Sequence, residues 1–186
     1  MSQPAEVLAA LAQAFASEGV RWYVFGAQAV MAYGRPRLTT DIDVTVELEL
    51  DQVPALAARL ESHGFSPQTP DFAQLAERTR VLPLAHEETG FPIDLVVAGP
   101  GLEHQFLDHA KRLDLGGVTV PVIDAPDLIT AKILAGRPQD LEDIRGILLE
   151  QGPALDLHRT KETLRLLEAA LDRGDLLSEL ERLLAR

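Results

Sequence analysis

The sequence contains no cysteine and no asparagine, and only three of its seventeen basic residues are lysines. The absence of cysteine excludes disulfide bonds, thiolate zinc sites and cysteine nucleophiles. The longest apolar stretch, residues 22–33, contains Gly26 and Gln28 and is too short to cross a bilayer. The first residues lack the basic and apolar regions of a signal peptide. We therefore expect a cytoplasmic protein without a membrane partner.

The 186 residues are enough for about one ordinary domain with a real core, because 46% of them are hydrophobic and 25% are charged. Acidic residues outnumber basic ones by 29 to 17, so the net charge is -12. This charge argues against a protein that binds nucleic acid through its overall charge, although a local basic patch remains compatible with it.

Hydrophobic periodicity predicts strands and helices that alternate early in the chain, with helices alone towards the end. The strands are expected at 21–25, 39–46, 81–86, 91–98 and 118–123. The helices are expected at 4–19, 27–33, 51–63, 102–112, 124–135 and 139–151, with two more in 156–186. This order predicts an α/β (α+β) fold, with a small mixed sheet flanked by helices. We place a first domain over residues 1–150 and a helical C-terminal extension, packed on it, over 151–186.

Three aspartates stand in segments where carboxylates are unfavourable. On a strand, Asp41 and Asp43 would point to the same face and repel each other, and a bound cation would reverse that cost. Asp94 interrupts the apolar run 91–97, where a lone carboxylate is expensive unless it is paired, metal-bound or exposed at a cleft. If the two strands are neighbours, the three carboxylates converge as in a two-metal phosphoryl-transfer site.

These residues belong to a longer pattern, FGAQAV at 25–30, GRPRLTTDIDV at 34–44 and IDL at 93–95. The pattern resembles nucleotidyltransferases of the DNA polymerase β superfamily. It is most similar to the small bacterial branch that includes the abortive-infection E toxins of type IV toxin–antitoxin systems. Two later segments, DLITAK at 127–132 and RPQDLEDI at 137–144, are also similar to that branch.

The resemblance implies a nucleotidyltransferase fold and two Mg²⁺ ions held by Asp41, Asp43 and Asp94. Asp94 would also be a candidate base, Lys132 a further catalytic residue, and a nucleoside triphosphate the substrate. The nucleotide would lie against Gly26 and Ala27, with Arg35, Arg37 and Thr40 as further binding residues. Ala27 departs from the family, which has Gly or Ser here, so a hydroxyl contact with phosphate would be missing.

Several of these residues have simpler interpretations. Gly26 alone indicates only a turn, although the helix start that follows it has free amides for phosphate. Arg35 and Arg37 suit either a solvated loop or a triphosphate site. Lys132 is either a snorkelling side chain or a cation that neutralises phosphate. Residues 137–143 suit either a helix cap with ion pairs or an active-site role.

We therefore expect a metal-dependent enzyme that moves a nucleoside monophosphate from a nucleoside triphosphate to an acceptor. The resemblance to toxins suggests tRNA as acceptor and a cognate antitoxin as partner. One alternative is an antibiotic- or metabolite-type nucleotidyltransferase with a small-molecule acceptor. The other is a non-catalytic nucleotide-binding protein with the same fold.

Overall fold

The computed structural model describes residues 2–185, which divide into two compact units. Among the described residues, the first unit comprises 2–28 and 38–123, and the second comprises 29–37 and 124–185. This grouping differs from the division expected after residue 150, because the helices that follow Ile123 pack with the C-terminal helices.

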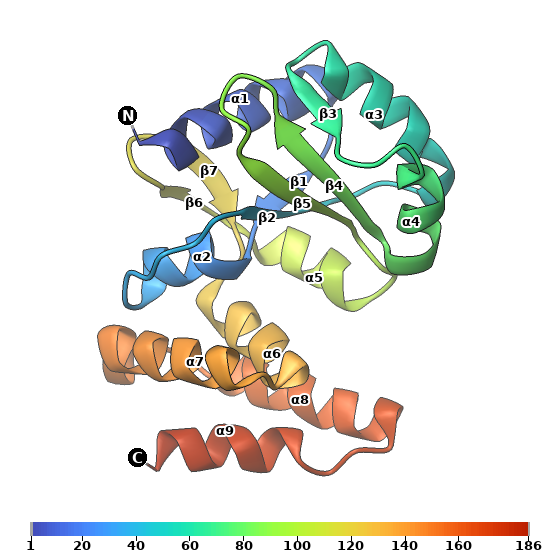
Figure 1. Ribbon diagram of the computed structural model, residues 1–186. Coiled ribbons are helices and arrows are strands. Elements are labelled where there is room, and N and C mark those ends of the chain that lie inside the picture. The colour runs from blue at the N-terminus through green and yellow to red at the C-terminus, as the bar shows by residue number, and fades with distance from the viewer. Residues whose placement is uncertain (1, 186) are drawn as a thin grey trace. The chain divides into compact units, whose positions relative to one another are not determined.

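A seven-stranded mixed sheet is the framework of the first unit (Figure 1). Its order is β3-β4-β5-β2-β1-β7-β6, with β2 parallel to β5, β1 parallel to β7, and the other neighbours antiparallel. The strands are β1 (Trp22–Val24), β2 (Ile42–Val46), β3 (Phe65–Pro67), β4 (Val81–His86), β5 (Pro92–Val97), β6 (Lys111–Asp114) and β7 (Thr119–Val122). The sheet and its helices confirm the predicted α/β class.

The helices of this unit cover the sheet with their apolar residues. They are α1 (Gln3–Glu18), the 3-10 turn η1 (Leu50–Gln52), α3 (Val53–Glu61), α4 (Phe72–Thr79) and α5 (Leu102–His109). Helix α1 packs on β7, α3 on β3 and α4 on β4. Helix α1 ends at Gly19, whose φ of 64° suits glycine because it has no Cβ.

The central strands β2 and β5 are held by alternating side chains. Ile42, Val44, Ile93 and Leu95 are fully buried, and each such side chain contributes about 1.5–3 kcal/mol by leaving water. A shift of one residue would expose this whole set, so its burial determines the register of the two strands. Asp43 and Asp94, which alternate with these residues, are consequently kept on the half-buried face.

Two expectations about secondary structure are wrong in their boundaries. The strand expected at 39–46 begins only at Ile42, because the Thr39 hydroxyl bonds the carboxylate and the carbonyl of Asp41 and holds a bend there. The helix expected at 102–112 ends at His109, and Lys111–Asp114 forms β6 instead. The two glycines at 116 and 117, both with positive φ, turn β6 back onto β7.

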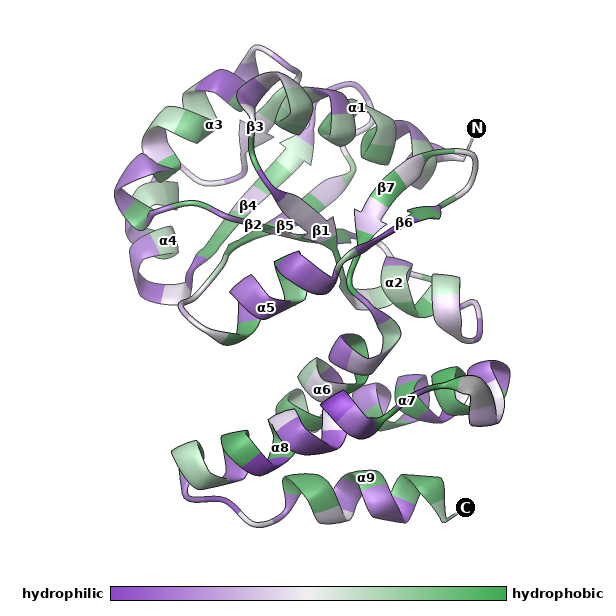
Figure 2. Ribbon diagram, turned by 180° about the vertical axis from the view of Figure 1, so that it is seen from behind, coloured by the Kyte–Doolittle hydropathy of each residue, from purple (hydrophilic) through white to green (hydrophobic). Residues whose placement is uncertain are grey.

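The second unit is helical. Helix α2 (Gly26–Tyr33) contributes its residues from Ala29 onwards, followed by α6 (Ala125–Ala135), α7 (Pro138–Gln151), the 3-10 turn η2 (Gly152–Ala154), α8 (His158–Leu171) and α9 (Leu176–Leu184). Figure 2 shows apolar and polar residues alternating along α8 and α9. Their buried members, Leu164, Leu176, Leu180 and Leu183, hold these helices together. Within residues 2–185, no helix is both long enough and apolar enough to span a membrane.

Candidate active site

Asp43 and Asp94 lie directly opposite each other on the parallel strands β2 and β5. Neighbouring strands are about 4.8 Å apart, and residues in register point to the same face. The expected adjacency of the two strands is therefore present, and it brings two carboxylates together. Like charges placed in this way repel, so the pair weakens the sheet unless something positive lies between them.

Asp41 lies in the bend that precedes β2, where its carboxylate accepts a hydrogen bond of 2.6 Å from the Thr39 hydroxyl. The negative charge of Asp41 also acts electrostatically on the Asp94 carboxyl. Burial, together with this charge, raises the pKa of the Asp94 carboxyl above its ordinary value. Asp41 thus acts on Asp94 through its charge, and Asp43 and Asp94 occupy paired strand positions.

Gly26 lies where β1 turns into α2, and its φ is +61°. A Cβ at this position would lie 1.8 Å from Oδ2 of Asp43. The backbone N–H of Phe25 also donates to the carbonyl of Asp43, at 3.0 Å. The start of α2 is therefore close against the Asp43 carboxylate, at a distance that only glycine allows.

We expect Gly26→Ala to displace the Asp43 carboxylate and to lower activity at least about tenfold. The left-handed backbone adds a stability cost of about 1–2 kcal/mol. Gly64→Ala is the matched control, because Gly64 has a φ of +79° and nothing within 4 Å of its Cβ position. Urea unfolding and a transfer assay on both variants separate the two effects. Equal activity in the two variants would contradict the close contact with Asp43.

Asp41, Asp43 and Asp94 supply the hard carboxylate oxygens that Mg²⁺ prefers, and their crowded charges favour a cation. The raised pKa of Asp94 reflects that crowding together with burial. Within the part of the chain that the structure describes, however, no three His, Asp or Glu side chains are grouped as a metal site. The donor chemistry fits a divalent cation, for which waters and substrate phosphates would supply the remaining ligands.

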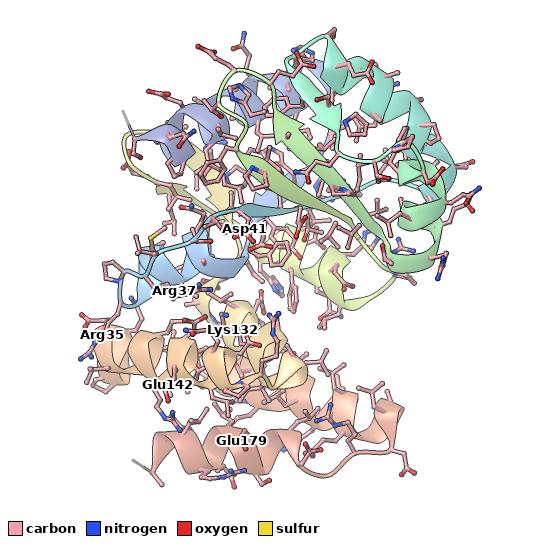
Figure 3. The ribbon with its side chains drawn as sticks, viewed as in Figure 1. Arg35, Arg37, Asp41, Lys132, Glu142 and Glu179 are labelled. Carbon is pink, nitrogen blue, oxygen red and sulfur yellow. The ribbon has the colours of Figure 1, made fainter. Side chains whose placement is uncertain are left out.

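Lys132 of α6 lies in the second unit, where it is buried with two carboxylates of α7 (Figure 3). Its ammonium lies 2.9 Å from Asp140 Oδ1 and 2.7 Å from Asp143 Oδ2. Arg137 adds a 2.7 Å bond to Asp140. Neither a snorkelling amine nor an open phosphate-binding cation describes this arrangement, which is a buried ion-pair cluster.

The cluster also sets the ionisation of Asp140. Burial alone would raise the pKa of this carboxyl, but the hydrogen bonds from Arg137 and Lys132 outweigh it and lower the pKa below its ordinary value. Of the two interpretations of residues 137–143, the ion-pair network describes the observed contacts.

The segment after α2 is attached to α7 by two arginines. Arg37 lies 3.2 Å from Asp143, and Arg35 lies 3.7 Å from Glu150 (Figure 3). Together with Gln139 and Arg145, they line a pocket of about 390 Å³ within the second unit. Arg35 and Arg37 thus already have acidic partners, although both are partly accessible in this pocket.

Two of the expected nucleotide-binding residues, Ala27 and Thr40, remain to be placed. Ala27 is buried in the first turn of α2, and Thr40 is exposed beside Asp41. The structure adds Thr39 and Gln28, which the sequence pattern did not single out. Thr39 had a detectable signal, a hydroxyl residue two positions before an aspartate. Gln28 had one as well, since it is a lone amide in an apolar stretch.

Comparisons with known proteins agree with this fold. A family model described as "Nucleotidyltransferase of unknown function (DUF6036)" matches residues 6–163. A comparison with curated protein sequences found no match. The matched region extends from within α1 to the first part of α8 and contains all the residues of the candidate site.

Solved structures show the same fold at low sequence identity. The antibiotic-resistance factor ANT(2'')-Ia is 14% identical, with a TM-score of 0.60 over 91% of this chain and 95% of that chain. An antigenic nucleotidyltransferase-like protein from Paracoccidioides brasiliensis is 21% identical, with a TM-score of 0.56 over 97% and 94%. The lincosamide adenylyltransferase LnuA is 14% identical, with a TM-score of 0.52 over 79% and 96%.

Proposed function

The chain belongs to this family of nucleotidyltransferases, and from that premise we propose that it moves a nucleoside monophosphate from a nucleoside triphosphate to an acceptor hydroxyl, releasing pyrophosphate. The observation that supports this proposal is the register of β2 and β5, which sets Asp43 opposite Asp94. A structural protein gains nothing from this repulsion, whereas a site for metal-bound phosphates uses it. Release of pyrophosphate, measured with each nucleoside triphosphate in turn, tests the proposal.

In this proposal Asp41, Asp43 and Asp94 hold divalent cations, with Mg²⁺ as the first choice and two ions as the expected number. When bound, such ions neutralise the charge of the triphosphate and of the leaving pyrophosphate. Asp94 is also the candidate base, which would accept the proton of the acceptor hydroxyl.

The other expected residues have supporting parts in the same proposal. The free amides at the start of α2, from Gly26 and Ala27 onwards, bind phosphate oxygens. Thr40 lies beside Asp41, and its hydroxyl adds a further contact to the nucleotide. Lys132 keeps Asp143 in place for Arg37, so it acts on position and not on phosphate.

A small hydroxylated molecule is the first candidate acceptor. The net charge of -12 disfavours a polyanionic acceptor. The structures that share this fold also include ANT(2'')-Ia in complex with adenylyl-2''-tobramycin and LnuA bound to lincomycin. These ligands identify a chemical class to test, namely compounds with several hydroxyl groups.

Transfer RNA is the second candidate acceptor. The pocket of the second unit combines arginines with the acidic residues Glu142 and Asp143, so its charge does not favour this acceptor. Transfer RNA accompanies the toxin interpretation, which also includes a cognate antitoxin and a cytoplasmic location. Only a few phosphates would be contacted, because Arg35 and Arg37 already have acidic partners.

Salt dependence distinguishes the two acceptors. For tRNA we expect the logarithm of the binding constant to fall with the logarithm of salt concentration at a slope on the order of -2 to -4. A small acceptor would respond to salt only through screening of the triphosphate. The measurement is label transfer from each radiolabelled nucleoside triphosphate onto total tRNA and onto a panel of hydroxylated compounds. Labelling of the panel alone, at every salt concentration, would reject the tRNA candidate.

A further inference from the structure

Gln28 carries a buried side-chain N–H donor, Nε2, that has no partner in the protein. The residue is 4% exposed, and its side-chain Nε2 is fully buried without a hydrogen-bond partner. Native proteins pair almost all such donors, because an unpaired one loses its bonds to water and gains nothing in return. An amide in this state is available to a partner outside the chain, whether a water molecule or a ligand.

The position of Gln28 relates this amide to the carboxylates. Gln28 is the third residue of α2, two residues after Gly26, whose Cα lies against the Asp43 carboxylate. Helical side chains lean towards the N-terminus of their helix. The carboxamide therefore extends towards the end of α2 at which the backbone amides have no partner within the helix. Gln28, Gly26 and Asp43 all belong to the first unit.

Packing alone does not account for a glutamine here. Its neighbours Ala27, Ala29 and Val30 are buried and apolar, and a methionine would fill the same volume. Methionine would also avoid burying an amide. The polar group therefore costs stability in the free protein, which is the usual cost of a group that serves a ligand.

We propose that Gln28 donates a hydrogen bond from Nε2 to a phosphate oxygen of the bound nucleoside triphosphate. This inference rests on the proposed function and adds a binding residue to it. Together with the backbone amides of the first turn of α2, the carboxamide forms a set of donors for the triphosphate. It supplies the side-chain donor that Ala27, with its methyl group, does not have.

The test uses Gln28→Met, which keeps the shape and removes the donor, and Gln28→Glu, which places a negative charge at the same atom. Calorimetry measures binding of each nucleoside triphosphate with Mg²⁺, and of inorganic tripolyphosphate, which has no base or sugar. Tyr33→Phe is the matched control, because it removes another buried polar atom without a partner from the same helix.

We expect Gln28→Met to bind both probes about tenfold to a hundredfold more weakly, since the lost bond is to a charged group. Its melting temperature without ligand should equal or exceed that of the wild type. Gln28→Glu should bind more weakly still, and Tyr33→Phe should keep the wild-type affinity.

Three results would overturn the inference. They are wild-type affinity in Gln28→Met, a melting temperature lowered by several degrees in that variant, or weaker binding of the nucleotide alone with tripolyphosphate unaffected. Failure of the wild-type protein to bind any nucleotide is a different outcome, because it rejects the proposed function itself.

Discussion

Asp43→Asn is expected to lower nucleotidyl transfer about a thousandfold or more while leaving the protein at least as stable as the wild type. The reason is the register of the two parallel strands, which sets Asp43 opposite Asp94. Replacing one carboxylate by an amide of the same shape removes a repulsion in the protein without metal. It also removes a hard oxygen ligand. Pyrophosphate release and thermal melts in EDTA measure the two effects.

Asp51→Asn is the matched control for this variant. Asp51 lies in the same unit, is exposed in the 3-10 turn η1, and undergoes the same chemical change. It should keep wild-type activity and stability within about 0.5 kcal/mol. A melting temperature lowered by several degrees in Asp43→Asn, but not in Asp51→Asn, would show that the carboxylate is structural. The catalytic assignment of the pair would then be wrong.

Lys132→Met is expected to destabilise the second unit by about 3–5 kcal/mol, the usual cost of removing one partner from a buried ion pair. Without the ammonium, Asp140 and Asp143 lie close together on α7, with contacts to Arg37, Arg137 and Gln139 but without the cation of α6. The side chains of Lys132, Asp140 and Asp143 are less than a tenth exposed, so water does not replace the lost charge. Urea unfolding measures the change.

Lys111→Met provides the comparison, since Lys111 is an exposed residue of β6 and its removal should change stability by about 0.5 kcal/mol or less. A second comparison, Lys132→Met combined with Asp140→Asn and Asp143→Asn, should recover much of the lost stability because the unpaired charges are gone. If Lys132→Met instead abolishes transfer with no loss of stability, Lys132 acts directly on the substrate.

The sequence by itself determined the fold class and identified the carboxylates that are candidates for the site. The short apolar run around Asp94 predicted β5 closely, because such runs are typical of strands within a sheet. Aspartates within such strands are costly, so the residue pattern alone identifies Asp43 and Asp94 as functional candidates. Gly26 could be recognised because a strand followed at once by a helix requires a turn. Each of these predictions depends on residues that are close together in the sequence, so it needs no knowledge of tertiary contacts.

Only the tertiary structure decided which charges meet. The sequence left two roles possible for Lys132, Asp140 and Asp143, namely a binding site or an ion-pair network. The structure was needed to decide, because neither helix alone specifies that α6 pairs with α7. The start of β2 shifted to Ile42 because one hydroxyl bonds the neighbouring Asp41. The unpaired amide of Gln28 was also invisible in sequence, since burial and hydrogen bonding are properties of packing. Residue types specify the available chemistry, whereas contacts between distant segments determine which of it is used.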